Sequence, residues 1–189
     1  MPPLGLRPIH PQSISSKMKG AGMTQKGRTM IASGAGFLWA LVLLWVAERY
    51  VTLPVFTLMP TIMTAFMAPG LVAAAMVLRV AMRRFGDEAM LAGGALQGAA
   101  AVDQRVLQNT LEQLVIALCV WPAAAIMLGD AGPGVIVVLG LGFALMRLVF
   151  WLGYHHAPLL RVFGFAGSFW PTVLVALWAL LRLGAGVAG

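Results

Sequence analysis

The chain alternates long apolar stretches with short polar ones. Apolar residues dominate five stretches, at about residues 31–47, 55–82, 105–127, 135–154 and 162–181. A helix needs about 20 residues to cross the hydrocarbon core of a bilayer, and these stretches are close to that length or longer. The pattern therefore predicts five transmembrane helices.

Composition supports the same class. Hydrophobic residues make up 60% of the 189 positions, charged residues only 10%, and the mean hydropathy is +0.89. These values indicate an integral membrane protein with no room for a second, soluble domain. The net charge of +7 comes from cations in the N-terminal tail, at helix ends and in loops. Membrane topology explains such a distribution better than a nucleic-acid partner does.

The basic residues also predict an orientation. Residues 1–30 are rich in Lys, Arg and Pro and contain no acidic residue, so we expect a disordered tail. With five spans, one side of the membrane would carry most of the basic residues: those of the tail, Arg79, Arg83, Arg84, Arg105 and Arg161. The other side would carry Arg49 and Arg182. The positive-inside rule then places the N-terminus in the cytoplasm. We expect a multi-pass protein of a bacterial inner membrane.

Several polar residues interrupt the predicted spans at helical spacing. Arg105, Asn109 and Glu112 form one stripe of a helix, and Arg147 and Tyr154 form another. A charged side chain at the bilayer centre costs roughly 2.5–3.5 kcal/mol and usually faces a partner or a wet cavity. Both stripes lie toward the cytoplasmic side, so we interpret them as the lining of one polar site. Glu112 is deep in its span, and Arg147 is its natural cationic partner.

Other polar residues suggest less specific roles. Asp87, Glu88 and Asp103 are interpreted as solvated charges of the loop 85–104. The adjacent histidines of the predicted loop 155–158 have no carboxylate or cysteine at ligand spacing, so no metal site is predicted.

At these stripes the chain resembles the MAPEG family, the membrane-associated proteins in eicosanoid and glutathione metabolism. Residues 105–112 are similar to the family's Arg-x-x-x-Asn-x-x-Glu signature, and residues 147–154 with Arg161 are similar to its second signature. The resemblance covers about residues 60–181. It implies a tail (1–30), an additional transmembrane helix (31–54) and a four-helix membrane domain (55–189).

The resemblance also implies a function. Family members are homotrimers that bind glutathione, as co-substrate, between subunits near the cytoplasmic face and act on lipophilic electrophiles as transferases or peroxidases. The residues implied to bind glutathione are Arg84, Arg105, Asn109, Glu112, Arg147, Phe150 and Tyr154. Arg161 matches the position that stabilises the glutathione thiolate and is the implied catalytic residue. The partners are then a lipophilic small molecule and membrane lipid.

A second interpretation stays open. The same charges would suit a non-enzymatic small membrane protein or a transporter, with Glu112 and Arg147 as a structural ion pair. Arg105 and Arg161 would then be anchors at the membrane interface. Five spans without an internal repeat argue against a secondary transporter.

Overall fold

The computed structural model describes residues 24–187, and its long segments are all helices. The long helices are α1 (Gln25–Tyr50), α3 (Met67–Phe85), α5 (Gly98–Met127), α6 (Gly132–His156) and α7 (Pro158–Val187). The short ones are η1 (Val55–Thr57), α2 (Leu58–Ala65), α4 (Glu88–Leu91) and η2 (Gly129–Ala131). Residues 1–23, most of the predicted tail, lie outside the described part.

Five helical segments are long and apolar enough to cross a membrane, which confirms the predicted all-α integral membrane fold. The second crossing is shared by α2 and α3, and its helical path bends at Phe66. The other crossings are single helices. Many large apolar side chains on their outer surfaces are exposed, as expected for helices that face lipid.

Two boundaries differ from the prediction. The first helix begins at Gln25 rather than near residue 31, and the Thr24 side chain caps it by accepting a hydrogen bond from the Gly27 amide at 3.3 Å. The predicted loop 85–104 contains α4 and the first turns of α5, which begins at Gly98. Asp103 therefore lies inside a helix rather than in a loop.

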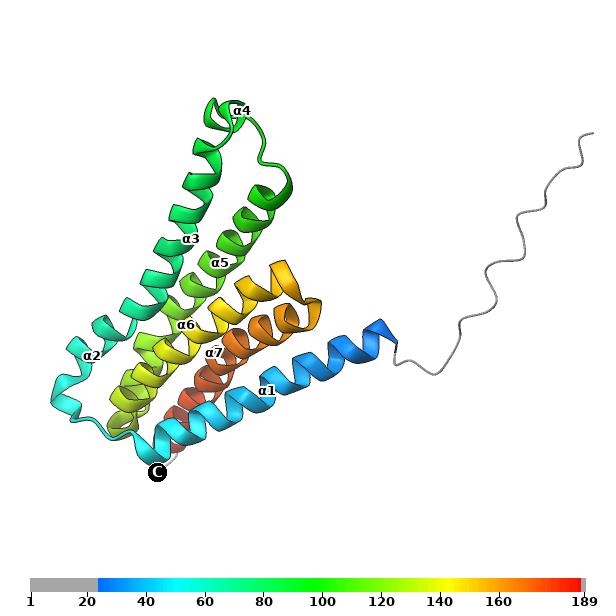
Figure 1. Ribbon diagram of the computed structural model, residues 1–189. Helices are drawn as coiled ribbons and strands as arrows, with labels where there is room; N and C mark the ends of the chain where they lie inside the picture. The colour runs from blue at the N-terminus through cyan, green and yellow to red at the C-terminus, as the bar shows by residue number, and fades with distance from the viewer. Residues whose placement is uncertain (1–23, 188–189) are drawn as a thin grey trace, which may run out of the picture.

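Consecutive crossings run in opposite directions and form a bundle around α6 and α7 (Figure 1). α1 lies along α7, α5 contacts α3, α6 and α7, and α2 packs on α6. Trp121 is 1% exposed and stacks on Phe66 at the centre of the larger apolar core. At the end that carries α4, α3 and α5 rise beyond the turn between α6 and α7 (Figure 1). The ends of α6 and α7 that carry His155 and Arg161 lie toward this same end.

The additional helix α1 comes closest to α7 at Gly36, where α1 has no side chain. A Cβ atom placed on Gly36 would lie 2.5 Å from the Cβ of Ala166 and 2.9 Å from the backbone nitrogen of Gly167. Both distances are shorter than real contacts, so only glycine allows the two backbones to approach this closely. Gly34, two residues earlier, has no atom within 4 Å of a Cβ atom placed on it.

We predict that Gly36→Val displaces α1 from α7. Overpacking of a tight contact costs about 1–3 kcal/mol, so the thermal midpoint of helix unfolding in detergent, followed by circular dichroism, is expected to fall. Gly34→Val is the matched control and should leave the midpoint unchanged or slightly raised, because valine costs less helical entropy than glycine. Equal losses in both variants would contradict the proposed contact.

Candidate functional site

Arg147 occupies the middle of the bundle and is completely buried. Its Nε donates a hydrogen bond to Thr110 Oγ1 at 3.2 Å, its Nη1 to Ser168 Oγ at 3.1 Å and its Nη2 to Asn109 Oδ1 at 2.8 Å. These acceptors come from α5 and α7, so one guanidinium of α6 joins three transmembrane helices. All three nitrogens of Arg147 are therefore engaged within a single chain.

The partners of Arg147 are neutral, which overturns the predicted ion pair with Glu112. The guanidinium carbon of Arg147 lies 4.0 Å from the centre of the buried Phe150 ring, whose π face favours a cation. Glu112 is exposed on the outer side of α5 and accepts a hydrogen bond from Gln108 Nε2 at 3.1 Å. The prediction failed because two helical stripes at one membrane depth need not face each other.

Four of the predicted site residues line one cavity of about 390 Å³: Asn109, Phe150, Tyr154 and Arg161. Val162 and Phe165 complete its wall. The Arg161 guanidinium lies over the Tyr154 ring, 5.0 Å from its centre, and Tyr154 meets Phe150 edge to face at 5.1 Å. α5, α6 and α7 thus bring an amide, a phenol and a cation to one hollow near the turn between α6 and α7.

The remaining predicted residues lie on outer surfaces. Arg105 and Glu112 are both exposed along α5, where a shallow hollow of about 570 Å³ is lined by Gln108, Leu111, Glu112 and neighbouring residues of that helix. Arg84 is exposed in the last turn of α3 and lines neither hollow. The predicted site residues are therefore divided between the buried network of Arg147, the cavity at Tyr154 and the outer surface of the bundle.

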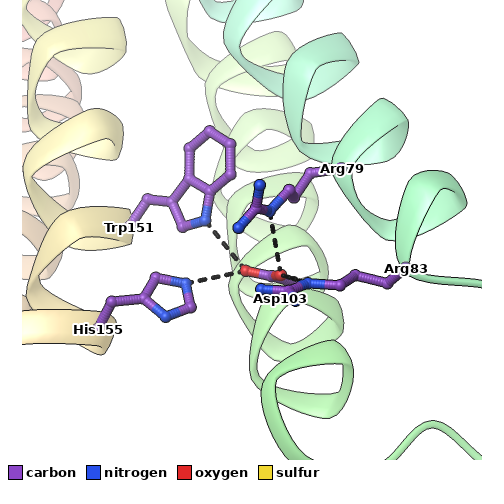
Figure 2. A network of polar contacts seen from close by, with 5 residues as sticks. All are labelled: Arg79, Arg83, Asp103, Trp151 and His155. Carbon is purple, nitrogen blue, oxygen red and sulfur yellow. Dashed lines mark hydrogen bonds and ion pairs between the residues drawn. The ribbon is translucent and has the colours of Figure 1, made fainter. Parts of the chain in front are cut away.

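Sequence reasoning missed a second polar cluster, centred on Asp103 (Figure 2). Asp103 is 2% exposed, and its carboxylate accepts hydrogen bonds from Arg83 Nε at 3.2 Å and Trp151 Nε1 at 3.2 Å. His155 Nε2 lies 2.9 Å from Asp103 Oδ1, and Arg79 Nε lies 3.5 Å from Oδ2. The cluster ties α5 to α3 on one side and to α6 on the other.

Two interpretations are corrected by this cluster. Asp103 is a buried ionic centre rather than a solvated loop charge, and His155 lies in the last turn of α6 rather than in a loop. A signal for Asp103 was present, because Asp103, Val106, Leu107 and Thr110 share the helical spacing of one buried face. Within residues 24–187 no group of three His, Cys, Asp or Glu side chains is placed to hold a metal ion.

The comparison with protein families gives a match to the model of the MAPEG family over residues 57–181. The chain belongs to the MAPEG family. The match includes α2 to α6 and α7 as far as Leu181, and it begins after α1. This MAPEG protein thus carries one transmembrane helix before the region that the family model covers, as its sequence indicated.

Two other comparisons add nothing to this assignment. No curated protein and no solved structure matched the chain. Membership in the MAPEG family supports a general role in membrane glutathione or eicosanoid chemistry, and members generally use glutathione.

We predict that Asp103→Asn destabilises the protein. The substitution keeps the shape of the side chain but removes the charge that Arg83 and Arg79 face, and one amide nitrogen would then point at a donor. The expected loss is about 1–3 kcal/mol, measured as a lower thermal midpoint in detergent. Asp130→Asn, at an exposed aspartate of η2, is the matched control and should have no measurable effect. Similar midpoints for the two variants would contradict a structural role of the Asp103 cluster.

Proposed function

We propose that this MAPEG protein is a glutathione-dependent membrane transferase or peroxidase that acts on lipophilic electrophiles. The observation that carries the proposal is the cavity in which Asn109, Tyr154 and Arg161 meet, beside the polar outer stripe of α5. A tripeptide with two carboxylates, an ammonium, two amides and a thiol requires this mixture of cations, an acid and amide partners.

The role proposed for each residue follows from which of its polar groups have no hydrogen-bond partner among the described residues. Asn109 uses its carbonyl oxygen for Arg147, so its amide nitrogen remains to bind a peptide carbonyl of glutathione. Arg105 would hold a carboxylate and Glu112 the γ-glutamyl ammonium. Arg147 would act indirectly, since its nitrogens already donate to protein oxygens, and we assign it the positioning of Asn109. Arg84 would contribute only long-range attraction, because it lies outside both hollows.

The thiolate would be stabilised by Arg161. Stacking on Tyr154 occupies the face of its guanidinium and leaves the N–H groups at the rim available for an anion. In the transferase reaction the thiol proton leaves to water and the sulfur forms a bond to an electrophilic carbon, from which the leaving group departs with its electron pair. In the peroxidase reaction two glutathione molecules reduce a hydroperoxide to an alcohol and water and become a disulfide.

The outer stripe of α5 supports a site between subunits. Arg105 and Glu112 are exposed on a helix that crosses the bilayer, and hydrocarbon does not solvate such groups. A neighbouring copy that covers this face would enclose them together with the bound tripeptide. We therefore propose a homotrimer, the assembly that is general in the family.

The placement of charge supports a cytoplasmic site. Arg28, Arg79, Arg83, Arg84, Arg105 and Arg161 belong to the end of the bundle that carries α4, whereas Arg49 and Arg182 belong to the opposite end. The positive-inside rule places the end with more cations in the cytoplasm, where glutathione is abundant in cells that make it. A bacterial inner membrane is the setting we propose.

The second candidate is a non-enzymatic membrane protein. One observation favours it: Arg147, the first residue of the second signature, is hydrogen-bonded within its own chain and needs no ligand. In that case the polar residues would stabilise the bundle alone, and glutathione would not bind.

We predict that the purified protein binds glutathione and conjugates chlorodinitrobenzene. Arg161→Ala should spare much of the affinity measured by isothermal titration but lower kcat by about 10²-fold or more, because the cation acts on the thiolate in the reaction. Arg182→Ala, at the opposite end of α7, is the control and should retain both the affinity for glutathione and kcat. No heat and no turnover in the unmodified protein would favour the second candidate, and a loss of affinity without loss of kcat would contradict the role of Arg161.

A second prediction concerns assembly. The intact complex in detergent is expected to have three times the mass of the 20.0 kDa chain when measured by native mass spectrometry. Glu112→Gln should leave this mass unchanged and weaken glutathione about tenfold, because a charge-assisted hydrogen bond to the ammonium becomes neutral. A monomer that still binds glutathione would contradict the intersubunit site.

A further inference from the structure

A second basic cavity lies where α1 meets the turn between α6 and α7. Its volume is about 410 Å³, and its wall includes Gln25, Arg28 and Thr29 of α1, His156 of α6, and Leu159 and Arg161 of α7. The α1 side of this wall precedes the region that the family model covers. The cavity therefore exists because this chain has an additional helix.

The lining of this cavity has the chemistry of an anion site. Two arginines, Arg28 of α1 and Arg161 of α7, line it from different helices, and His156 of α6 is also part of its wall. Thr29 and Gln25 add neutral polar groups. None of the described residues that line it is acidic. An anion held here finds two permanent cations, whereas a cation finds no counter-charge.

The position of the cavity selects the source of the anion. Arg28 is the fourth residue of α1 and Arg161 the fourth of α7, so each lies about one turn inside the end of an apolar helix. That is the level at which phospholipid headgroups meet the hydrocarbon. Ile31 and Leu160 follow lining residues on α1 and α7, are exposed, and would contact acyl chains. Basic pockets between transmembrane helices at this level are suited to anionic headgroups.

We propose that the cavity between α1 and the α6–α7 turn binds the phosphate headgroup of an anionic phospholipid. Phosphatidylcholine is disfavoured, because its choline cation would meet two guanidinium groups and no carboxylate. The volume is within the range of known ligand pockets and large enough for a headgroup, while the acyl chains remain in the bilayer.

The same inference connects the lipid to the cavity described above. Arg161 and Val162 line both hollows, so one guanidinium stands between the lipid headgroup and the thiolate of the proposed glutathione site. This connection rests on the proposed function; the lipid site itself does not. A phosphate that engages the N–H groups of Arg161 would reduce their availability to the thiolate.

The experiment measures lipid binding without glutathione. The full chain, purified in detergent and stripped of lipid, is titrated with short-chain phosphatidylglycerol or phosphatidylcholine, and bound lipid is counted by native mass spectrometry. We expect tighter binding of phosphatidylglycerol. Arg28→Gln should weaken it about fivefold, the value of one interfacial cation. Arg28→Lys should retain most of the binding, and Arg49→Gln, at the exposed opposite end of α1, should retain all of it.

Each other outcome would overturn the assignment. Equal affinity for the two lipids, or equal losses for Arg28→Gln and Arg49→Gln, would indicate non-specific adsorption. Binding of inorganic phosphate that depends on Arg28, without binding of phosphatidylglycerol, would show a site for a soluble anion. Circular dichroism checks that each variant is folded. If Arg28→Gln does not fold, Arg28→Lys keeps the test valid. Glutathione binding by Arg28→Gln is measured in a separate titration. Failure of the proposed function is therefore distinguishable from failure of the lipid site.

Discussion

The constraint on which this bundle depends is the burial of a guanidinium among transmembrane helices. Arg147 cannot be solvated by water, and its nitrogens are satisfied by Asn109, Thr110 and Ser168. Each of these bonds fixes the rotation of a helix relative to α6. An interior ion pair would need only one partner, but three neutral acceptors determine how α5, α6 and α7 face each other, and so determine which side of α5 is turned outward.

A second polar centre, around Asp103, lies about 10 Å nearer the end of the bundle at 1.5 Å per residue along α5. It adds α3 to the helices that Arg147 connects. On α6, Phe150 and Tyr154 of the cavity wall lie between Arg147 of the first centre and His155 of the second, so each end of this wall is fixed by polar contacts. The rim that would bind a ligand is thus placed by groups that do not touch the ligand.

The sequence was sufficient for the number of helices and for the family, because apolar length and two spaced signatures do not depend on how helices are rotated. It placed Asn109, Tyr154 and Arg161 in one site, and the structure brings them to one cavity. It failed for Glu112 and Asp103, whose partners depend on helix rotation and on the early start of α5 at Gly98. Spacing along one helix says which residues share a face, but not which helix that face meets.

The contact at Gly36 has a mechanical consequence. At this point only the Ala166 methyl group lies between the two helices, so α1 and α7 are expected to tilt together. A bilayer that is too thin or too thick for a helix changes the tilt of that helix at modest cost. Because Arg161 is the fourth residue of α7, a change in bilayer thickness that tilts α1 and α7 would also move the side chain proposed to stabilise the thiolate.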